Sequence, residues 1–304
     1  TSKEISCEHC LTKKHKSGET TFHHNALQAA LVHPTIKQAI PIGVEDIRNE
    51  DGTKKQDCEI NAAKRLIPEL RKQHPQLDII LLADGLFSNH PMVEMVKAQG
   101  MDFIFTAKPG DHTYLFAWIE NHQSNIKELR VYKDKGTEHV YRWAENVPLE
   151  SAGKSYVNFF ELKIFAPDEK TNELKCTYRS SWVTNLTLAE ANIEKMTAAA
   201  RTRWKIENQC FNNLKNRGYS LEHNFGHGSQ YLAFNFYILT LVAFLFHQVF
   251  EITDALYQIA RARWSQRMLW ERMRAFFTGF IFSSWEQLLT HCLHPPDVNS
   301  PVTV

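Results

Sequence analysis

The sequence lacks the features that would place it in a specialised class. Its six cysteines are scattered at positions 7, 10, 58, 176, 210 and 292, too few for a disulfide scaffold, so we expect a reducing, cytoplasmic setting. Signal peptide, internal repeats and low-complexity segments are not apparent. The longest apolar run, 231–246, has 16 residues and includes Asn235, whereas a membrane span needs about 20. We therefore expect a globular protein with no membrane partner and a buried helix at 231–246.

Charge of one sign is also lacking overall, because 35 basic and 34 acidic residues leave a net charge of +1. The basic residues are nevertheless concentrated in two stretches, 195–217 and 261–274. Local basic faces suit a phosphate backbone. Two solvated amphipathic helices would explain the same pattern. Trp264 and Trp270 lie between the arginines of the second stretch and fit either DNA binding or helix packing.

The first half of the chain predicts an α/β core. Two short apolar runs, 79–83 and 103–107, are typical of strands buried on both faces. A helix from Pro91, ended by Gly100, separates them and completes a β-α-β unit. Asp84 follows the first of these strands, at the sheet edge where ligands gather in α/β proteins. Upstream we expect strands at 21–32 and 36–42 and a helix at 57–73, which Pro68 should kink or end early.

The second half changes character twice. Residues 128–184 alternate like antiparallel strands and predict an inserted β module. Thr187 and Glu190 predict a capping box that opens helices running to about Asn216, and further helices follow to 292. We thus predict four parts: a core with its first strand upstream (1–127), a β-rich insertion (128–186), a core helix carrying Glu207 (187–228) and a helical C-terminal region (229–304).

Two acids carry the chemistry in this reading. A carboxylate at a strand tip, Asp84, and one on a later helix, Glu207, supply the hard oxygen ligands that Mg²⁺ prefers. Two such ions, held by three or more carboxylates, align water and a leaving 3′ oxygen at a phosphodiester. Simpler roles exist for each residue taken alone. Asp84 would suit a turn before Gly85, and Glu207 would pair with Arg203 one helical turn earlier.

Three segments resemble the DDE transposases of bacterial insertion sequences: ADGLFSN (83–89), WVTNL (182–186) and RTRWKIENQCFNNLKNRGYSLEHNFGHG (201–228). They are most similar to the group with a β-rich insertion before the catalytic glutamate. The resemblance implies an α/β fold with a ribonuclease-H-like mixed sheet flanked by helices. It also implies that Asp84 and Glu207 are the second and third catalytic acids and bind two Mg²⁺ ions, with Mn²⁺ as a substitute. Arg203, Lys205 and Lys215 would then contact DNA.

The chain departs from the family signature Tyr-x2-Arg-x3-Glu-x6-Lys in three ways. Ala200 replaces the tyrosine. Lys215 comes eight residues after Glu207 rather than seven, about 80° around a regular α-helix, and Leu214 takes the expected place. No residue matches the first aspartate, which we expect just before Thr1; the sequence would then be truncated or a remnant.

The resulting functional hypothesis is a transposase that cuts double-stranded DNA at element ends and joins the 3′ hydroxyl to a target. It would act in the nucleoid, as a homodimer on paired ends. The alternatives are a ribonuclease-H-like nuclease without strand transfer and a catalytically dead DNA-binding remnant. A separate segment, Cys7-x2-Cys10-x4-His15 followed by His23 and His24, has part of the spacing of a zinc knuckle. It predicts either a surface loop with reduced thiols or a structural Zn²⁺ site, and we favour the loop.

Overall fold

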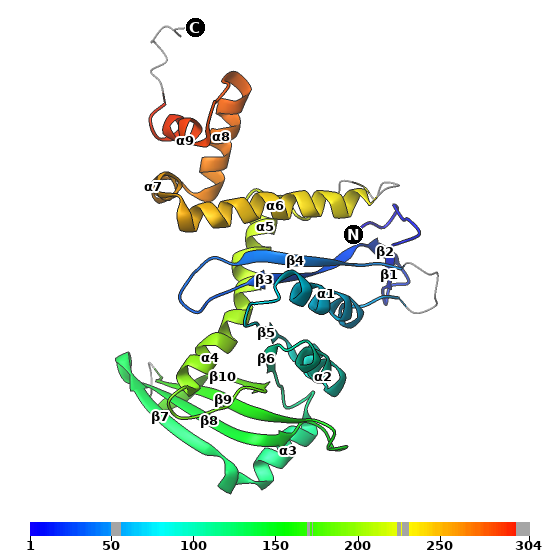
Figure 1. Cartoon of the computed structure of the whole chain (residues 1–304), viewed down its shortest axis with the longest axis vertical. Helices are drawn as coiled ribbons and strands as arrows, with labels where there is room; N and C mark the ends of the chain where they lie inside the picture. Colours follow the sequence, from blue (N-terminus) through cyan, green and yellow to red (C-terminus); the bar gives the residue numbers. More distant parts are fainter. Residues whose placement is uncertain (50–55, 169–170, 172, 224–225, 227–230, 296–304) are drawn as a thin grey trace. The chain divides into compact units, whose positions relative to one another are not determined.

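The computed structural model describes residues 1–49, 56–168, 171, 173–223, 226 and 231–295 (Figure 1). Two compact units divide these residues. The first combines both ends of the chain, residues 1–57 and 204–304, and the second consists of residues 58–203. Each unit has its own core and is described by itself.

The second unit is built on one six-stranded mixed sheet with the order β5-β6-β10-β9-β8-β7 (Figure 1). Only β5 and β6 are parallel, with Ile80 opposite Asp102, and the other neighbours are antiparallel. The predicted insertion strands therefore continue the sheet of the predicted β-α-β unit, through β10 beside β6. The strands are β5 Ile80–Ala83, β6 Asp102–Thr106, β7 Lys127–Lys133, β8 Thr137–Pro148, β9 Tyr156–Pro167 and β10 Leu174–Thr184.

Alternation along the strands gives this sheet two apolar faces. Ile104, Phe160 and Trp182 point to one face and pack with Ile193 of helix α4 (Ile193–Arg201). On the other face, Phe159 meets Phe116 of α3 (Thr113–Asn121) edge to face at 5.7 Å. Helix α2 (His90–Ala98) contacts β6, and α1 (Glu59–Gln73) precedes β5 in the chain. Helices flanking a mixed sheet confirm the predicted ribonuclease-H-like α/β class.

Two local predictions in this unit need correction. Helix α1 does not end early at Pro68 but continues to Gln73, because the Lys64 carbonyl that loses its partner lies on an exposed residue where water can hydrogen-bond to it. The capping box at Thr187 does not form. Instead the Asn192 side chain accepts from the Ala189 N–H and donates to the Thr187 carbonyl, so the helix begins at Ile193.

The first unit contains two hairpins and most of the C-terminal half. Strands β1 (Leu11–Lys14) and β2 (Thr20–His23) form one hairpin, and β3 (Asn25–Leu31) and β4 (Ile40–Ile47) form the other. The predicted strand at 21–32 is thus broken at His24. A core of Ala39, Cys210, Leu214, Tyr219, Leu241 and Phe244 joins the second hairpin to the helices. The helices are α5 Asn212–Asn216, α6 Leu232–Thr253, α7 Ala255–Arg263, α8 Gln266–Gly279 and α9 Trp285–Leu293.

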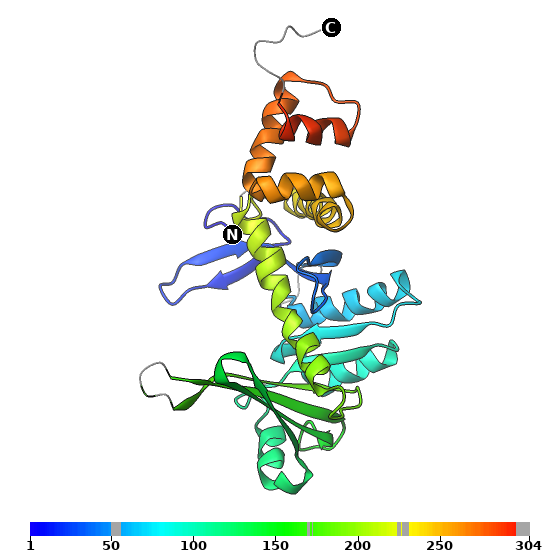
Figure 2. The same cartoon turned by 90° about the vertical axis from the view of Figure 1, so that its left-hand side faces the viewer.

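Helix α6 is less buried than predicted. Its buried residues form one stripe, Leu241, Phe244, His247 and Gln248, whereas Leu239 and Phe246 are 63% and 55% exposed. Among the described helices, α6 is the one long and apolar enough to cross a membrane by length and composition. Helices α7, α8 and α9, orange to red in Figure 2, pack on one another around Tyr257 and Leu289.

Candidate active site

Asp84 lies where the sequence predicted, directly after strand β5. That strand was predicted to be buried on both faces, but it lies at the edge of the sheet and Ile80 is 44% exposed. It is the N-cap of the short 3₁₀ turn η1 (Gly85–Phe87), and its Oδ1 accepts the Leu86 N–H at 3.0 Å. The residue is exposed. The turn role considered from sequence is therefore real, and the same hydrogen bond fixes the direction of an exposed carboxylate beyond the strand end. An exposed carboxylate held in this way offers the hard oxygen ligands that Mg²⁺ prefers.

A second acid lies beside this turn, and the sequence analysis did not select it. A Cβ placed on Gly85 would lie 3.5 Å from Asp111 Oδ2 and 3.5 Å from the Thr106 carbonyl oxygen. Asp111 is exposed and belongs to the loop that follows β6, the parallel neighbour of β5. Its position after that strand was the available signal, because carboxyl ends of parallel strands share one edge of a sheet.

Buried His112 joins the two loops at this edge. Its Nε2 lies 2.9 Å from the Ser88 carbonyl oxygen, and its Nδ1 lies 3.3 Å from the Lys108 backbone nitrogen. Donation from Nε2 and acceptance at Nδ1 satisfy one neutral tautomer. The buried imidazole thus links the turn that follows Asp84 to the loop that contains Asp111. The Lys108 side chain is exposed.

Glu207 lies on an irregular stretch of helix. Helix α4 gives way to a 3₁₀ turn, η4 (Thr202–Trp204), and then to a π-helical turn, η5 (Ile206–Phe211), before α5. Glu207 is exposed within the π-turn, next to fully buried Cys210. π-Turns inside α-helices occur frequently at functional sites. Asp84 belongs to the second unit and Glu207 to the first, so their surroundings are described separately.

The π-turn corrects the angle expected for Lys215. A π-turn contains one residue more than an α-turn. Eight residues through this stretch therefore complete about the rotation that seven complete in a regular α-helix. Leu214, which takes the signature place by counting, is 0% exposed in the core, whereas Lys215 is exposed and pairs with Glu222 at 2.8 Å. Lys215, not Leu214, is the side chain presented to solvent.

Lys205 is already engaged within the protein. Its Nζ lies 2.6 Å, 3.2 Å and 2.7 Å from the carbonyl oxygens of His33, Pro34 and Ile36. These contacts occupy the three ammonium hydrogens, and desolvation by burial lowers the pKa of Lys205. The lysine predicted to contact DNA thus fixes the turn between β3 and β4. Arg203 is half-buried in η4.

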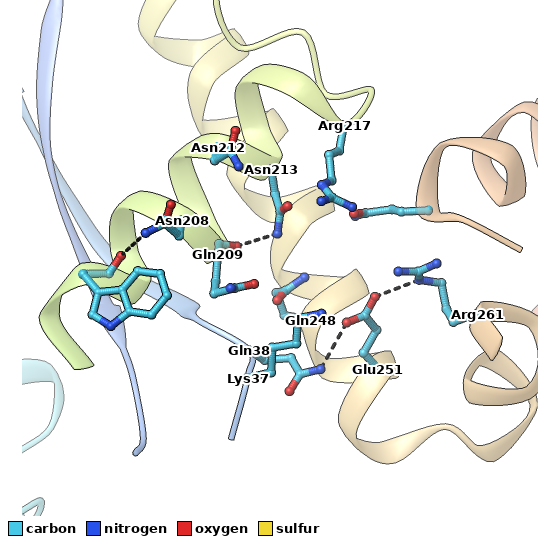
Figure 3. Close-up of a pocket in the computed structure, with 12 residues that line it drawn as sticks. Lys37, Gln38, Asn208, Gln209, Asn212, Asn213, Arg217, Gln248, Glu251 and Arg261 are labelled. Atoms are coloured by element: carbon cyan, nitrogen blue, oxygen red, sulfur yellow. Dashed lines mark hydrogen bonds and ion pairs between the residues drawn. The ribbon is translucent and has the colours of Figure 1, made fainter. Parts of the chain in front are cut away.

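A polar pocket of about 300 Å³ opens beside the helix that carries Glu207 (Figure 3). Amide side chains form much of its wall, and Gln38 donates to Glu251 at 3.1 Å while Arg261 pairs with the same carboxylate at 2.8 Å. The lining residues are Lys37, Gln38, Trp204, Asn208, Gln209, Asn212, Asn213, Arg217, Gln248, Glu251, Arg261 and Gln266. Trp204 is 48% exposed, so an indole face borders the pocket.

The arginine-rich stretch at 261–274 mostly serves packing. Arg263 and Arg272 stack on the Trp264 ring at 5.2 Å and 4.3 Å, and Arg263 also donates to the Leu293 carbonyl. Trp270 packs edge to face on Tyr219 and His247. Of the two interpretations left open by the sequence, helix packing is what the structure shows for both tryptophans.

A comparison with known protein families identifies the family of this chain. A family model described as the transposase DDE domain matches residues 13–245. The chain belongs to the DDE transposase family. A search of curated proteins found no match.

The match spans most of this DDE transposase and confirms the resemblance. It covers Asp84 and Glu207, whose catalytic roles stay predictions, and it ends within α6, before the helices α7 to α9.

The structure replaces the predicted zinc ligand His15 with His24. The His15 Nε2 atom lies 3.0 Å from Thr21 Oγ1, because His15 sits near the tip of the β1–β2 hairpin, and His24 occupies the place near the two cysteines instead.

Proposed function

We propose that the chain acts as a DNA transposase, cutting double-stranded DNA at the ends of a bacterial insertion sequence and joining the 3′ hydroxyl to target DNA. Membership of the DDE transposase family is the observation that carries this proposal. A cytoplasmic, nucleoid-associated protein that acts as a homodimer on paired ends belongs to the same proposal. So do the boundaries 1–127, 128–186, 187–228 and 229–304 of core, insertion, core helix and C-terminal region.

Asp84 and Glu207 are the residues that we propose hold the metal. Mg²⁺, or Mn²⁺ in its place, would polarise the scissile phosphate and lower the pKa of an attacking water. Asp84 is suited to this by its capped turn, which fixes the carboxylate before any ion binds. Asp111 lies beside that turn and is a further candidate ligand.

The cations and amides near Glu207 have a separate role in the proposal. The π-turn leaves Lys215 on the exposed side of the helix, and we assign it a phosphate contact. Arg203 keeps the DNA contact that the resemblance implies. Lys37 and Arg217 add positive charge to the amide-lined pocket, where phosphate and base edges would find donors. Lys205 is assigned to fixing the β3–β4 turn rather than to DNA.

The test uses supercoiled DNA carrying the segments that flank the gene, incubated with the protein and Mg²⁺ or with EDTA. Asp84→Asn and Glu207→Gln keep side-chain size and remove the carboxylate charge. We expect 3′-hydroxyl ends with Mg²⁺ only, a loss of at least about 10²-fold in both variants, and unchanged DNA binding. Glu222→Gln, which changes the exposed acid that pairs with Lys215, is the control and should cut normally.

The outcomes separate the alternatives. Cleavage with joined products supports a transposase, and cleavage that never yields joined products supports a ribonuclease-H-like nuclease. DNA binding without cleavage, for a protein that includes any residues encoded upstream of Thr1, supports a DNA-binding remnant. Equal cleavage by the wild type and by Glu207→Gln would refute the assignment of Glu207.

A further inference from the structure

Three metal-ligating side chains meet in the N-terminal part of the first unit. Cys7 Sγ and Cys10 Sγ are 3.6 Å apart, and His24 Nε2 lies 3.4 Å from the first sulfur and 3.6 Å from the second. Cys10 is 4% exposed, and the other two residues are half-buried. This group of three side chains is called the Cys-Cys-His cluster below.

The distances match one face of a tetrahedral zinc site. With Zn–S bonds of about 2.3 Å and a Zn–N bond of about 2.0–2.1 Å, tetrahedral angles place two sulfurs about 3.8 Å apart and sulfur and nitrogen about 3.6 Å apart. All three separations in the cluster lie within about 0.2 Å of these values. A disulfide is a different geometry, because it requires sulfurs about 2.05 Å apart.

The backbone brings the three residues together through the β1–β2 hairpin and the turn before it. Leu11 pairs with His23 in the β1–β2 hairpin, so Cys10 and His24 are the next residues outward on the two strands. Cys7 returns to them through a tight turn in which the Cys10 N–H donates to the Cys7 carbonyl at 3.2 Å. The Cys7 N–H points to Cys10 Sγ at 3.3 Å, the kind of donor that stabilises a metal-bound thiolate.

The turn between the cysteines is itself anchored. Asn49, which follows β4, donates from Nδ2 to the Cys10 carbonyl at 3.1 Å, and its own carbonyl lies 3.1 Å from His9 Nδ1. The His9 ring stacks on the Tyr231 ring with 5.7 Å between centroids, and the Arg48 guanidinium lies 4.4 Å from the Tyr231 ring centroid. Ligands that are held in place before metal binds lose little conformational freedom on binding, so this support favours a structural site.

We propose that the Cys-Cys-His cluster binds a structural Zn²⁺ ion through Cys7 Sγ, Cys10 Sγ and His24 Nε2, with the fourth tetrahedral position filled by a ligand from outside this cluster. Soft thiolates with one imidazole in tetrahedral arrangement select Zn²⁺ rather than the Mg²⁺ of phosphoryl transfer. The ion would tie the N-terminal turn to a hairpin of two four-residue strands, which is too small to be stable alone. The site is distinct from Asp84 and Glu207 and does not depend on the proposed function.

The first measurement is the metal content of the purified full chain, prepared under reducing conditions with zinc in the growth medium. We expect about one Zn²⁺ per chain. Cys7→Ser and His24→Asn should lose most of it, and His15→Asn, the ligand predicted from spacing alone, should keep it. A wild type without zinc, or a Cys7→Ser variant that retains the full amount, would overturn the proposal.

A second measurement needs no variant, so it stands even where a substitution disturbs folding. The wild-type chain is alkylated with and without a zinc chelator, and each cysteine is read by peptide mass spectrometry. Exposed Cys58 and Cys176 should react in both samples, whereas Cys7 and Cys10 should react only after chelation. Protection that a reductant removes and a chelator does not would indicate a disulfide and would also overturn the proposal.

Discussion

Acid should destabilise the first unit through His247, which is buried in α6. Its Nδ1 lies 2.6 Å from the Tyr219 hydroxyl, and Gln266 Nε2 donates to that hydroxyl at 3.0 Å. The imidazole also stacks on Tyr257. Tyr219 therefore donates to Nδ1, so the neutral imidazole is the form that fits. Desolvation by burial lowers the pKa of His247 to about 4, with Glu251 opposing and Arg261 reinforcing the shift.

The sign and size of the effect follow from linkage. Because the folded pKa lies below the unfolded value of about 6.5, the unfolded state binds more protons between these two pH values. The free energy of unfolding therefore falls as pH drops from 6.5 toward 4. A shift of about 2.5 pKa units, at 1.36 kcal/mol each, corresponds to about 3 kcal/mol.

The assay compares urea denaturation of the wild type and His247→Asn from pH 7.5 to pH 4, followed by tryptophan fluorescence. Asparagine keeps an acceptor near the Nδ1 position and does not titrate. We expect the difference between the two stability curves to change by about 3 kcal/mol across this range. His294→Asn, at an exposed position, is the control and should follow the wild-type curve. A His247→Asn difference that stays flat within about 1 kcal/mol would refute the argument from burial.

Three further substitutions test other parts of the structure. Lys205→Ala should lower the free energy of unfolding by about 1–3 kcal/mol, since three carbonyls lose a charged donor, and should leave DNA affinity nearly unchanged at matched folding. Lys215→Ala should change stability by less than about 1 kcal/mol and reduce the salt dependence of DNA binding. If Lys205→Ala reduced the salt dependence and Lys215→Ala did not, Lys205 and not Lys215 would be the phosphate contact. Glu161→Gln should cost about 1–3 kcal/mol in urea denaturation, because it removes the charge of a 2% exposed carboxylate that pairs with Arg142 and half-exposed Arg179, while Arg142 keeps Glu128 and Gln123 as partners. A cost below about 1 kcal/mol would show that water compensates the lost charge.

The sequence predicts the positions of the strands well, although burial on both faces is correct for β6 and wrong for the edge strand β5. The runs at 79–83 and 103–107 are short, continuous and apolar, and both form strands of the parallel pair. The four strands of 128–184 alternate apolar and polar residues and form as predicted. Sequence could not tell that they extend the same sheet, because that depends on β10 pairing with β6 across about 75 residues.

Predictions about single side chains depend on distant partners, which the local sequence does not show. Lys205 is predicted to contact DNA because it lies on a basic helix, but its ammonium group donates to carbonyl oxygens near residue 34. His15 fitted a zinc spacing, yet the hairpin register brings His24 to the cysteines. In both cases the deciding contact joins segments whose relation local spacing does not encode.

The π-turn at 206–211 links the departure in the sequence to the chemistry proposed for the helix. An extra residue between an acid and a lysine would rotate the lysine by about 100° in a regular α-helix and put an apolar residue in its place. Here the extra residue is absorbed within the turn that contains Glu207, so Cys210 and Leu214 stay in the core and Lys215 stays in solvent. A π-turn has wider hydrogen-bond spacing than an α-turn and persists where something offsets its cost. In this helix Cys210, which accepts from Gln28 at 3.0 Å, and Leu214 both pack in the core of the first unit. The insertion that weakens the match to the family signature is therefore also the feature that preserves the exposed positions of both signature residues.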